Sequence, residues 1–382
     1  MKSLALALLL VPVTIFAANV TVDCSGATPG AFTSINTAVG TLDAVGPNTV
    51  FVSGTCVENV VISSHDRVTL QGSPSATIQA ASGTVLRVDR SEGVVLRGLT
   101  ITGGNRGLHL QRNTDAMIET LTVENSGTGV VIDDGALGVF GGPNATQAVI
   151  IRNNSAAGAS TNGGTFRASG NVTIENNGGP GIDAAHSRVG LLGNAAPNIV
   201  RKNGGNGVFA HAGSDVDMNG ANQVTGNALT GILAFESASV DLLGSPSQFT
   251  TVDGNLRGGV VYIFSASGRV QNAVISNNGS ANNPLSSGLT VANNASATVI
   301  GLTITGTVGP GVIVDSGGMA RLNGTTISGG TAEPIRLVTG GILELQTGNT
   351  FTGTDKNVVV CDDSAVLFGD GATVPTSCRK TK

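Results

Sequence analysis

The chain has 382 residues, of which 40% are hydrophobic and only 12% are charged, and its formal net charge at pH 7 is −5. This composition argues against a nucleic-acid partner, because there is no basic stripe to neutralise phosphates and few aromatic side chains on which bases could stack. The 56 glycines accompany apolar residues that recur in register, so we expect an ordered core rather than a disordered chain.

Residues 1–18 have the layout of a secretory signal peptide. Lys2 precedes an apolar run that ends at Phe16, and the small residues Ala17 and Ala18 follow. This run is too short for a transmembrane span, and no later stretch offers about 18 uninterrupted apolar residues. We therefore expect a secreted protein, extracellular or periplasmic, with no transmembrane segment. Its oligomeric state is left open.

After the signal, residues 31–44 predict a short amphipathic helix. Phe32, Ile35, Val39 and Leu42 fall at helical spacing between a Pro-Gly and a Gly-Pro pair. Such a helix would cover one end of a stack of strands, whose unpaired edges are otherwise exposed to water.

The middle of the chain is built from repeats. The mean step between equivalent apolar residues, from Ile78 to Phe351, is about 25 residues, which is too short for a strand-helix-strand crossover. Three short parallel strands in each coil fit this period. An asparagine followed four residues later by glycine occurs six times, at Asn125/Gly129, Asn154/Gly158, Asn177/Gly181, Asn203/Gly207, Asn227/Gly231 and Asn255/Gly259.

Alternate residues of each strand must point inward, and equivalent residues of successive coils should stack about 4.8 Å apart. The repeated asparagine has a physical reason, since it tolerates the left-handed backbone of a sharp bend and its amide can bond to the same amide in the next coil. The residues expected to stack inside are Val208/Ala210, Ile232/Ala234 and Val260/Tyr262.

These features resemble the right-handed parallel β-helix proteins of the pectin-lyase-like superfamily, whose bends often carry asparagine ladders. The segment GTCVEN, residues 54–59, is similar to the Gly-Thr-Tyr-x-Glu-Asn segment of many β-helices, with Cys56 in place of the tyrosine. The resemblance implies an all-β fold, a right-handed parallel β-helix of about 13 turns with a short N-terminal capping helix. We divide the chain into an N-terminal cap (19–49), the β-helix (50–360) and a C-terminal cap (361–382).

The four cysteines lie near the two ends of the predicted rod. Because a rod holds its ends far apart, we expect the local disulfides Cys24 with Cys56 and Cys361 with Cys378, formed in an oxidising compartment. Free buried thiols are the alternative.

Superfamily members that act on acidic polysaccharides place their catalytic groups on the outer face of the stack. Three consecutive coils of this chain carry outward or corner residues of that kind. The predicted catalytic residues are Asp217, Asp241, His211 and Arg188, and the predicted binding residues are Asp183, His186, Asp215, Glu236, Phe209, Phe235 and Phe264. In this alignment His186, His211 and Glu236 occupy the corner before the strands that carry the aspartates.

Each group has a chemical reason. Asp217 and Asp241 on adjacent coils approach the separation used by retaining glycoside hydrolases, and paired carboxylates also suit calcium, although no cofactor is required by the pattern. A histidine could exchange protons, Arg188 could bind a substrate carboxylate, and the phenylalanines could offer apolar platforms. The alternative is an ordinary solvated β-face.

Known enzyme motifs are missing. Asp133-Asp134 and Asp362-Asp363 are aspartate pairs of the kind polygalacturonases use, but the rest of that signature is absent, and Asp362-Asp363 fits an end cap. The sequence therefore predicts a secreted protein that engages extracellular polysaccharide, with hydrolase or lyase activity as a hypothesis. A noncatalytic surface, adhesive or structural protein is the alternative.

Overall fold

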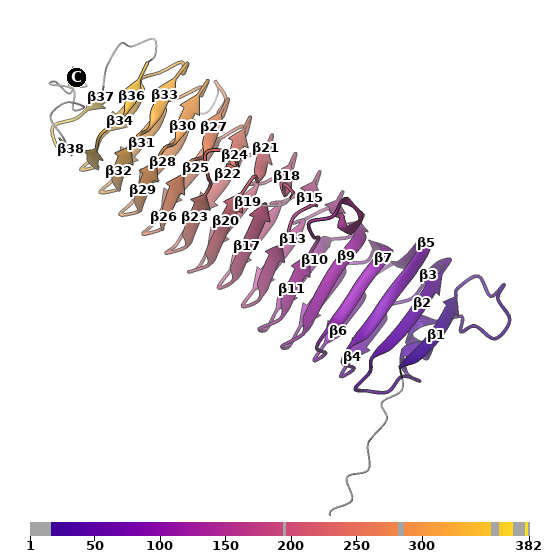
Figure 1. Ribbon diagram of the computed structural model, residues 1–382. Coiled ribbons are helices and arrows are strands. Elements are labelled where there is room, and N and C mark those ends of the chain that lie inside the picture. The colour runs from indigo at the N-terminus through magenta and orange to yellow at the C-terminus, as the bar shows by residue number, and fades with distance from the viewer. Residues whose placement is uncertain (1–16, 194–195, 282–285, 353–358, 370–378, 381–382) are drawn as a thin grey trace, which may run out of the picture.

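The structure is a computed structural model that describes residues 17–193, 196–281, 286–352, 359–369 and 379–380. Parallel strands stack into a rod, with the N-terminal strands at one end and the C-terminal strands at the other (Figure 1). The prediction of an all-β parallel β-helix of about 13 turns is confirmed. No helix in the described part of the chain is long and apolar enough to cross a membrane.

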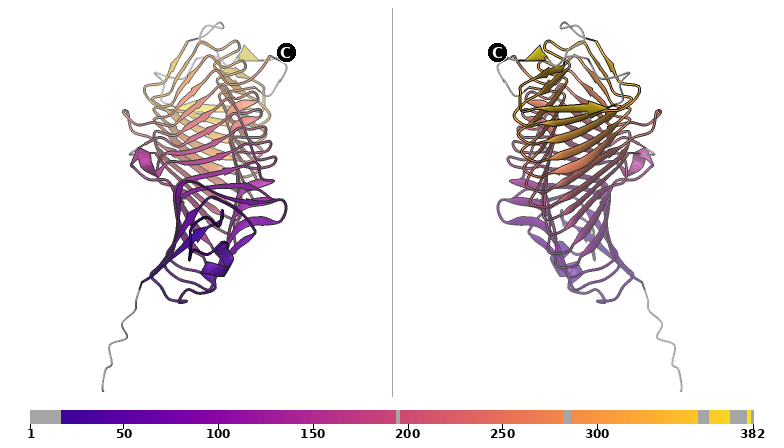
Figure 2. Two further views of the ribbon diagram at one scale, coloured as in Figure 1. Left: turned by 90° about the vertical axis from the view of Figure 1, so that its right-hand side faces the viewer. Right: turned by 90° about the vertical axis from the view of Figure 1, so that its left-hand side faces the viewer.

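Each middle coil contributes one strand to each of three faces, as the period predicts. Face 3 is the 14-stranded sheet, and faces 1 and 2 together make up the 25-stranded sheet. Faces 1 and 2 count as one sheet because the long strands β5, β7 and β9 run through both. Two views turned by 90° show the successive coils stacked on one another (Figure 2).

Face 1 contains strands whose outward side chains include the predicted aspartates. Its strands are β1 (Ala18–Asp23), β2 (Asn48–Ser53), β5 (Val68–Ala80), β7 (Val94–Gly103), β9 (Asp115–Glu124), β11 (Leu137–Phe140), β14 (Thr165–Ala168), β17 (Arg188–Gly193), β20 (Asp215–Gly220), β23 (Ser239–Leu243), β26 (Ser267–Gln271), β29 (Ser296–Ile300), β32 (Met319–Asn323), β35 (Ile342–Leu345) and β38 (Val366–Gly369).

Face 2 consists of shorter strands, and a 3-10 turn η1 (Ala145–Gln147) precedes β12. Besides the second halves of β5, β7 and β9, its strands are β3 (Thr55–Val57), β12 (Val149–Arg152), β15 (Val172–Glu175), β18 (Ile199–Arg201), β21 (Gln223–Thr225), β24 (Thr251–Asp253), β27 (Val274–Ser276), β30 (Thr303–Thr305), β33 (Thr326–Ser328) and β36 (Thr350–Phe351).

Face 3 lies between face 2 and face 1 along the chain. Its strands are β4 (Val60–Ser63), β6 (Thr84–Asp89), β8 (Arg106–Gln111), β10 (Thr128–Asp133), β13 (Ala159–Asn162), β16 (Ile182–Ala185), β19 (Val208–His211), β22 (Thr230–Ala234), β25 (Gly258–Ile263), β28 (Leu289–Ala292), β31 (Val312–Asp315), β34 (Ile335–Leu337), β37 (Val359–Cys361) and β39 (Arg379–Lys380).

The core is one continuous column of apolar side chains. Val208 pairs with Ile232, which pairs with Val260, and all three are fully buried, as predicted. The neighbouring column runs Ala210, Ala234, Tyr262, so like residues do not stack throughout. The larger ring fits because its hydroxyl donates to the Val240 carbonyl at 2.8 Å and because residue 268 is a glycine. A Cβ there would lie 2.6 Å from the ring.

The asparagine ladder exists, with two corrections to its predicted membership and backbone. Nδ2 of each asparagine donates to Oδ1 of the next at 2.8–3.0 Å, through Asn154, Asn177, Asn203, Asn227, Asn255 and Asn278. Asn125 is not a member, because Ser126 occupies the ladder position in its coil. The left-handed residue is the one before each ladder asparagine, for example Asn153 with φ 55°.

The glycine four residues after each ladder asparagine from Asn154 to Asn255 is explained by the same contacts. A Cβ on Gly207 would lie 2.5 Å from the Gly231 carbonyl oxygen and 2.8 Å from Asn227 Nδ2. Any side chain at this position would push the coils apart, so the Asn-x-x-x-Gly repeat follows from close approach of successive backbones.

The N-terminal helix α1 (Ile35–Val39) is shorter than the predicted 31–44. Phe32 forms a bridge with Val22, which holds the preceding residues extended, and Gly40 ends the helix. The carboxylate of Glu58 accepts from the main-chain nitrogens of Ile35 and Asn36 at 2.6 and 3.2 Å. An acidic group at a helix N-terminus is stabilising, so the GTCVEN segment serves to hold the cap.

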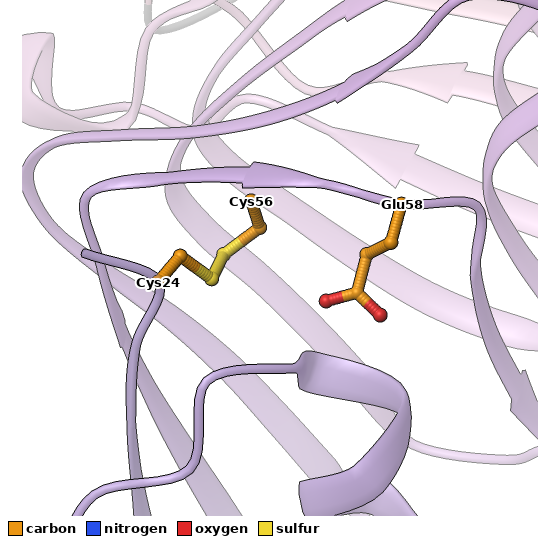
Figure 3. Close-up of side chains that lie close together, drawn as sticks. All are labelled: Cys24, Cys56 and Glu58. Carbon is orange, nitrogen blue, oxygen red and sulfur yellow. A yellow bond between two sulfur atoms is a disulfide. The ribbon is translucent and has the colours of Figure 1, made fainter. Parts of the chain in front are cut away.

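The Cys24–Cys56 disulfide is confirmed, with a Cα–Cα distance of 5.1 Å, and it ties the cap to β3 beside Glu58 (Figure 3). The partner predicted for Cys361, Cys378, lies outside the described residues, as does most of the predicted signal peptide. Asp362 accepts from the main-chain nitrogen of Thr339 at 2.7 Å near the C-terminal end. Strands β38 and β39, within the range predicted as the C-terminal cap, continue the stack.

Candidate functional site

The predicted aspartates of face 1 lie together on two neighbouring strands. Asp217 on β20 is directly opposite Asp241 on β23, and Asp215 is two residues before Asp217 on the same strand. Val216 and Met218 are fully buried, so the intervening aspartates must point outward. We call Asp215, Asp217 and Asp241 the acidic cluster.

Two arginines flank the acidic cluster. Arg188 on β17 is opposite Asp215, with its Nε 3.6 Å from the Asp215 carboxylate, and both side chains are largely exposed. Arg269 on β26 is opposite Asp241, and its main-chain nitrogen donates to Asp241 Oδ1 at 2.7 Å.

Partial burial raises the pKa of Asp217 above its ordinary value, and the charges of Asp215 and Asp241 raise it further, whereas Arg188 opposes the shift. The carboxyl group of Asp217 is thus biased toward its protonated form, as expected of a general acid.

The surface of face 1 is hollowed on two sides of the acidic cluster. One hollow of about 260 Å³ is lined by Leu192, Asn219 and Leu243, farther along the same strands. A second, of about 310 Å³, lies over the following strands β26 to β38 and is lined by Ser267, Ser296, Met319, Arg321, Glu344 and Phe368. Only the cluster itself was evident from the sequence, because the second hollow draws on residues from five coils.

The structure places His211 on a different face. It is the last residue of β19 on face 3 and not part of the corner, as the sequence alignment assumed. Its Nε2 lies 3.1 Å from Asp183 Oδ1, so the two predicted residues pair with each other. No contact joins this pair to the acidic cluster among the described residues.

The predicted phenylalanines form one aromatic group with His211. The His211 ring stacks on Phe209 at 4.5 Å between centroids, Phe209 lies 6.2 Å from Phe235, and Phe235 meets Phe264 edge to face at 5.0 Å. Phe264 is about half exposed. This group follows the edge between face 3 and the corner that leads to face 1.

The corner itself contains His186, Glu236 and Phe264, each with φ between 50° and 55°. Bulky side chains are uncommon in this left-handed backbone region, which the turn between faces 3 and 1 imposes. His186 and Glu236 are thus corner residues as predicted.

An apolar groove beside the aromatic group was not predicted from the sequence. It encloses about 260 Å³ on face 3, and Leu233, Val261, Ile263 and Ile313 line it, with Arg257 and Asp315 also contributing. Outward apolar residues on consecutive face 3 strands were the available signal, but in a strand buried on one side they are hard to tell from core residues.

Side chains of the types that bind metals gather at one place within the described residues. Cys24, Cys56 and Glu58 lie close together, but the two sulfurs form the disulfide and Glu58 caps the helix. The carboxylates of the acidic cluster do not meet as a comparable group of three. Calcium binding there stays a prediction.

Comparison with known proteins agrees with this architecture. The family described as the right handed beta helix region matches residues 48–196 and 84–247, which together span more than half of the chain. The chain belongs to the right-handed β-helix family. No curated protein matches the sequence.

The β-helix is similar in structure to the A-module of mannuronan C-5 epimerase AlgE4 from Azotobacter vinelandii. The TM-score is 0.54 at 13% identity, with 88% of this chain and 93% of that chain covered. Pectate lyase Pel9A matches at a TM-score of 0.31 and 12% identity, covering 96% of this chain and 83% of that chain. The first match shows a shared fold, and the second is too weak to add to it.

Proposed function

We propose that this β-helix protein is an exported hydrolase of an extracellular polysaccharide, with Asp217 as general acid and Asp241 as its partner carboxylate. The observation that carries the proposal is the direct pairing of Asp217 with Asp241 on adjacent strands, between two hollows of face 1. Export rests on the signal-like N-terminus alone.

The spacing of the strands suggests the stereochemical course. Adjacent strands lie about 4.8 Å apart. Two carboxyl groups separated by about 5 Å suit a retaining mechanism, in which one protonates the leaving oxygen and the other forms a glycosyl-enzyme intermediate. The raised pKa of Asp217 assigns it the acid role, and Asp241, which accepts from a main-chain nitrogen, is the nucleophile.

The elongated shape of the rod supports a polymeric substrate. A chain laid along face 1 would cross the hollow bounded by Leu192 and Leu243, then the acidic cluster, and Phe368 would offer an exposed apolar surface in the second hollow. Several sugar residues could therefore be held at once, and remote binding of this kind helps to position the reacting bond.

The test is a cleavage assay on purified protein with a panel of neutral and uronate-containing polysaccharides, measured as new reducing ends. We expect wild-type activity on at least one, and a loss of about 100-fold or more in Asp217→Asn and Asp241→Asn. Asp115→Asn is the matched control, because Asp115 is an exposed residue of face 1 that pairs with Leu137. It should keep wild-type activity.

The proposal fails if the wild type cleaves none of the panel, or if Asp217→Asn remains active. Detection of a retained anomeric configuration in the first product would support the assigned roles. An inverted product would overturn the role of Asp241 as nucleophile.

The aromatic group and the apolar groove favour a second candidate function, noncatalytic adhesion to glycan. Phe209, Phe235 and Phe264 form a continuous surface next to a groove on face 3, away from the acidic cluster. A wild-type protein that binds insoluble glycan without cleaving it, and loses binding in Phe235→Ser, would support this candidate.

A further inference from the structure

The first coils of face 3 carry a second cluster of charged residues, separate from the acidic cluster. Arg87 on β6 is opposite His109 on β8, and Arg106 begins β8. His109 is almost completely buried, its Nε2 lies 3.1 Å from Asp133 Oδ2, and its Nδ1 lies 3.4 Å from Arg106 Nη1. We call Arg87, Arg106, His109 and Asp133 the basic cluster.

This cluster carries an excess positive charge. Burial lowers the pKa of His109, and the charge of Arg106 lowers it further, while Asp133 opposes the shift. A neutral imidazole that donates from Nε2 to Asp133 leaves Nδ1 free to accept from Arg106. The basic cluster then holds two guanidinium groups and one carboxylate, and that carboxylate is already paired with His109.

Arg87 differs from three cross-strand arginines of the rod. Arg152, Arg201 and Arg321 are each directly opposite a glutamate and bond to it at 2.7–2.8 Å. Arg87 instead has Val61 on one side and His109 on the other. Its Nε is buried without a hydrogen-bond partner. A buried charged donor left unpaired is costly, so this position is prepared for an acceptor from outside the chain.

Arg87 also lines a hollow of about 270 Å³. The hollow lies at the start of β4 and β6, and its other lining residues are Asn59, Val61, Ser82, Gly83 and Thr84. Thr84 is directly opposite Arg106 on the next strand, so Arg106 begins the strand beside the hollow without lining it. The space is large enough for a sugar ring or another small molecule.

We propose that this hollow binds a carboxylate, with Arg87 as the bidentate partner and Arg106 as the second positive charge. A planar guanidinium matches a carboxylate through two parallel hydrogen bonds. Uronate residues of an acidic glycan and free small carboxylates share this chemistry. The site lies on face 3, several coils from the acidic cluster, so it stands whether or not the protein is a hydrolase.

The test is calorimetric binding to the full-length mature protein. Short oligogalacturonate, its methyl ester, monomeric galacturonate and a sulfated, uronate-free carrageenan oligosaccharide are the probes. We expect oligogalacturonate to bind, its methyl ester to bind at least about tenfold more weakly, and Arg87→Gln to lose about tenfold or more in affinity. Equal binding of the monomer would identify a small carboxylate as the source, and weaker binding of the monomer would identify a glycan.

Arg97→Gln is the matched control, because Arg97 is an exposed arginine of β7 that bonds to Gln71 at 2.8 Å, and it should bind as the wild type does. Arg106→Gln, at an exposed position, provides a second variant if Arg87→Gln does not fold, and it should also weaken binding. The proposal is overturned if methyl-ester and acid bind alike, if carrageenan binds as tightly, or if neither arginine variant differs from Arg97→Gln. Cleavage by the acidic cluster is a separate readout, so the two proposals fail independently.

Discussion

The asparagine ladder and the acidic cluster are both columns of polar residues that face each other on successive coils, yet their chemistry differs. A side-chain amide both donates and accepts, so Asn177, Asn203 and Asn227 satisfy one another in the interior. A carboxylate accepts only, and partial burial together with the charges of Asp215 and Asp241 raises the pKa of Asp217. Repetition along the rod therefore stabilises the amides and destabilises the ionised carboxylates.

The contrast distinguishes a polar column that the fold itself explains from a polar pair that the fold does not explain. Natural β-faces avoid like charges directly opposite each other because they repel. A pair that persists in spite of this cost is a candidate for chemistry, whereas a buried amide column is explained by the fold alone.

The largest effect should come from breaking the ladder. Asn203→Ala removes the acceptor for the main-chain nitrogen and Nδ2 of Asn177 and leaves both donors buried. We expect a loss of about 3 kcal/mol in the free energy of unfolding, measured in urea. Asn323→Ala, on the outer side of face 1, should change it by about 0.5 kcal/mol or less. Equal effects of the two substitutions would show that the ladder contributes nothing specific.

A smaller effect should follow from removing one buried hydrogen bond. In Tyr262→Phe the Val240 carbonyl oxygen loses the hydroxyl that donates to it at 2.8 Å, while the ring still fills the core. We expect a loss of about 1 kcal/mol, measured in the same way. An unchanged stability would mean that the hydroxyl is not required to satisfy this part of the interior.

The smallest effect should be a gain. Because the folded-state pKa of Asp217 is raised, its ionisation lowers the free energy of unfolding at neutral pH. This cost disappears as pH falls below the pKa that the same carboxyl group has in the unfolded chain. Asp217→Asn should raise the free energy of unfolding at pH 7 by about 0.5 kcal/mol or less. The gain should vanish near pH 3. A loss of stability at pH 7 would show that the charge is favourably paired.

The sequence predicted the coils well because their period and inward pattern are local properties. Val208, Ile232 and Val260 stack as expected, and Asp217 and Asp241 are opposite each other as expected. Asn125 was misplaced by one residue, because the repeat spacing alone does not distinguish the ladder residue from the left-handed residue before it.

The candidate sites were harder to predict because they depend on which face a residue joins. His211 aligns with the corner residues His186 and Glu236 when coils of unequal length are compared. The strand register instead pairs it with Ala185, one residue before the corner, and places it on face 3 beside Asp183. Arg87 showed no signal in the sequence. Its distinction is a buried Nε without a hydrogen-bond partner, which becomes visible only in the structure.

The central claim is that Asp217 and Asp241 of the acidic cluster are electrostatically coupled. Its most direct test is a titration of Asp217 by carbon NMR in aspartate-labelled protein. The account predicts a pKa for Asp217 above the ordinary value of about 3.9, and a decrease toward that value in Asp241→Asn. A pKa for Asp217 at or below the ordinary value, unchanged by removal of the Asp241 charge, would contradict it.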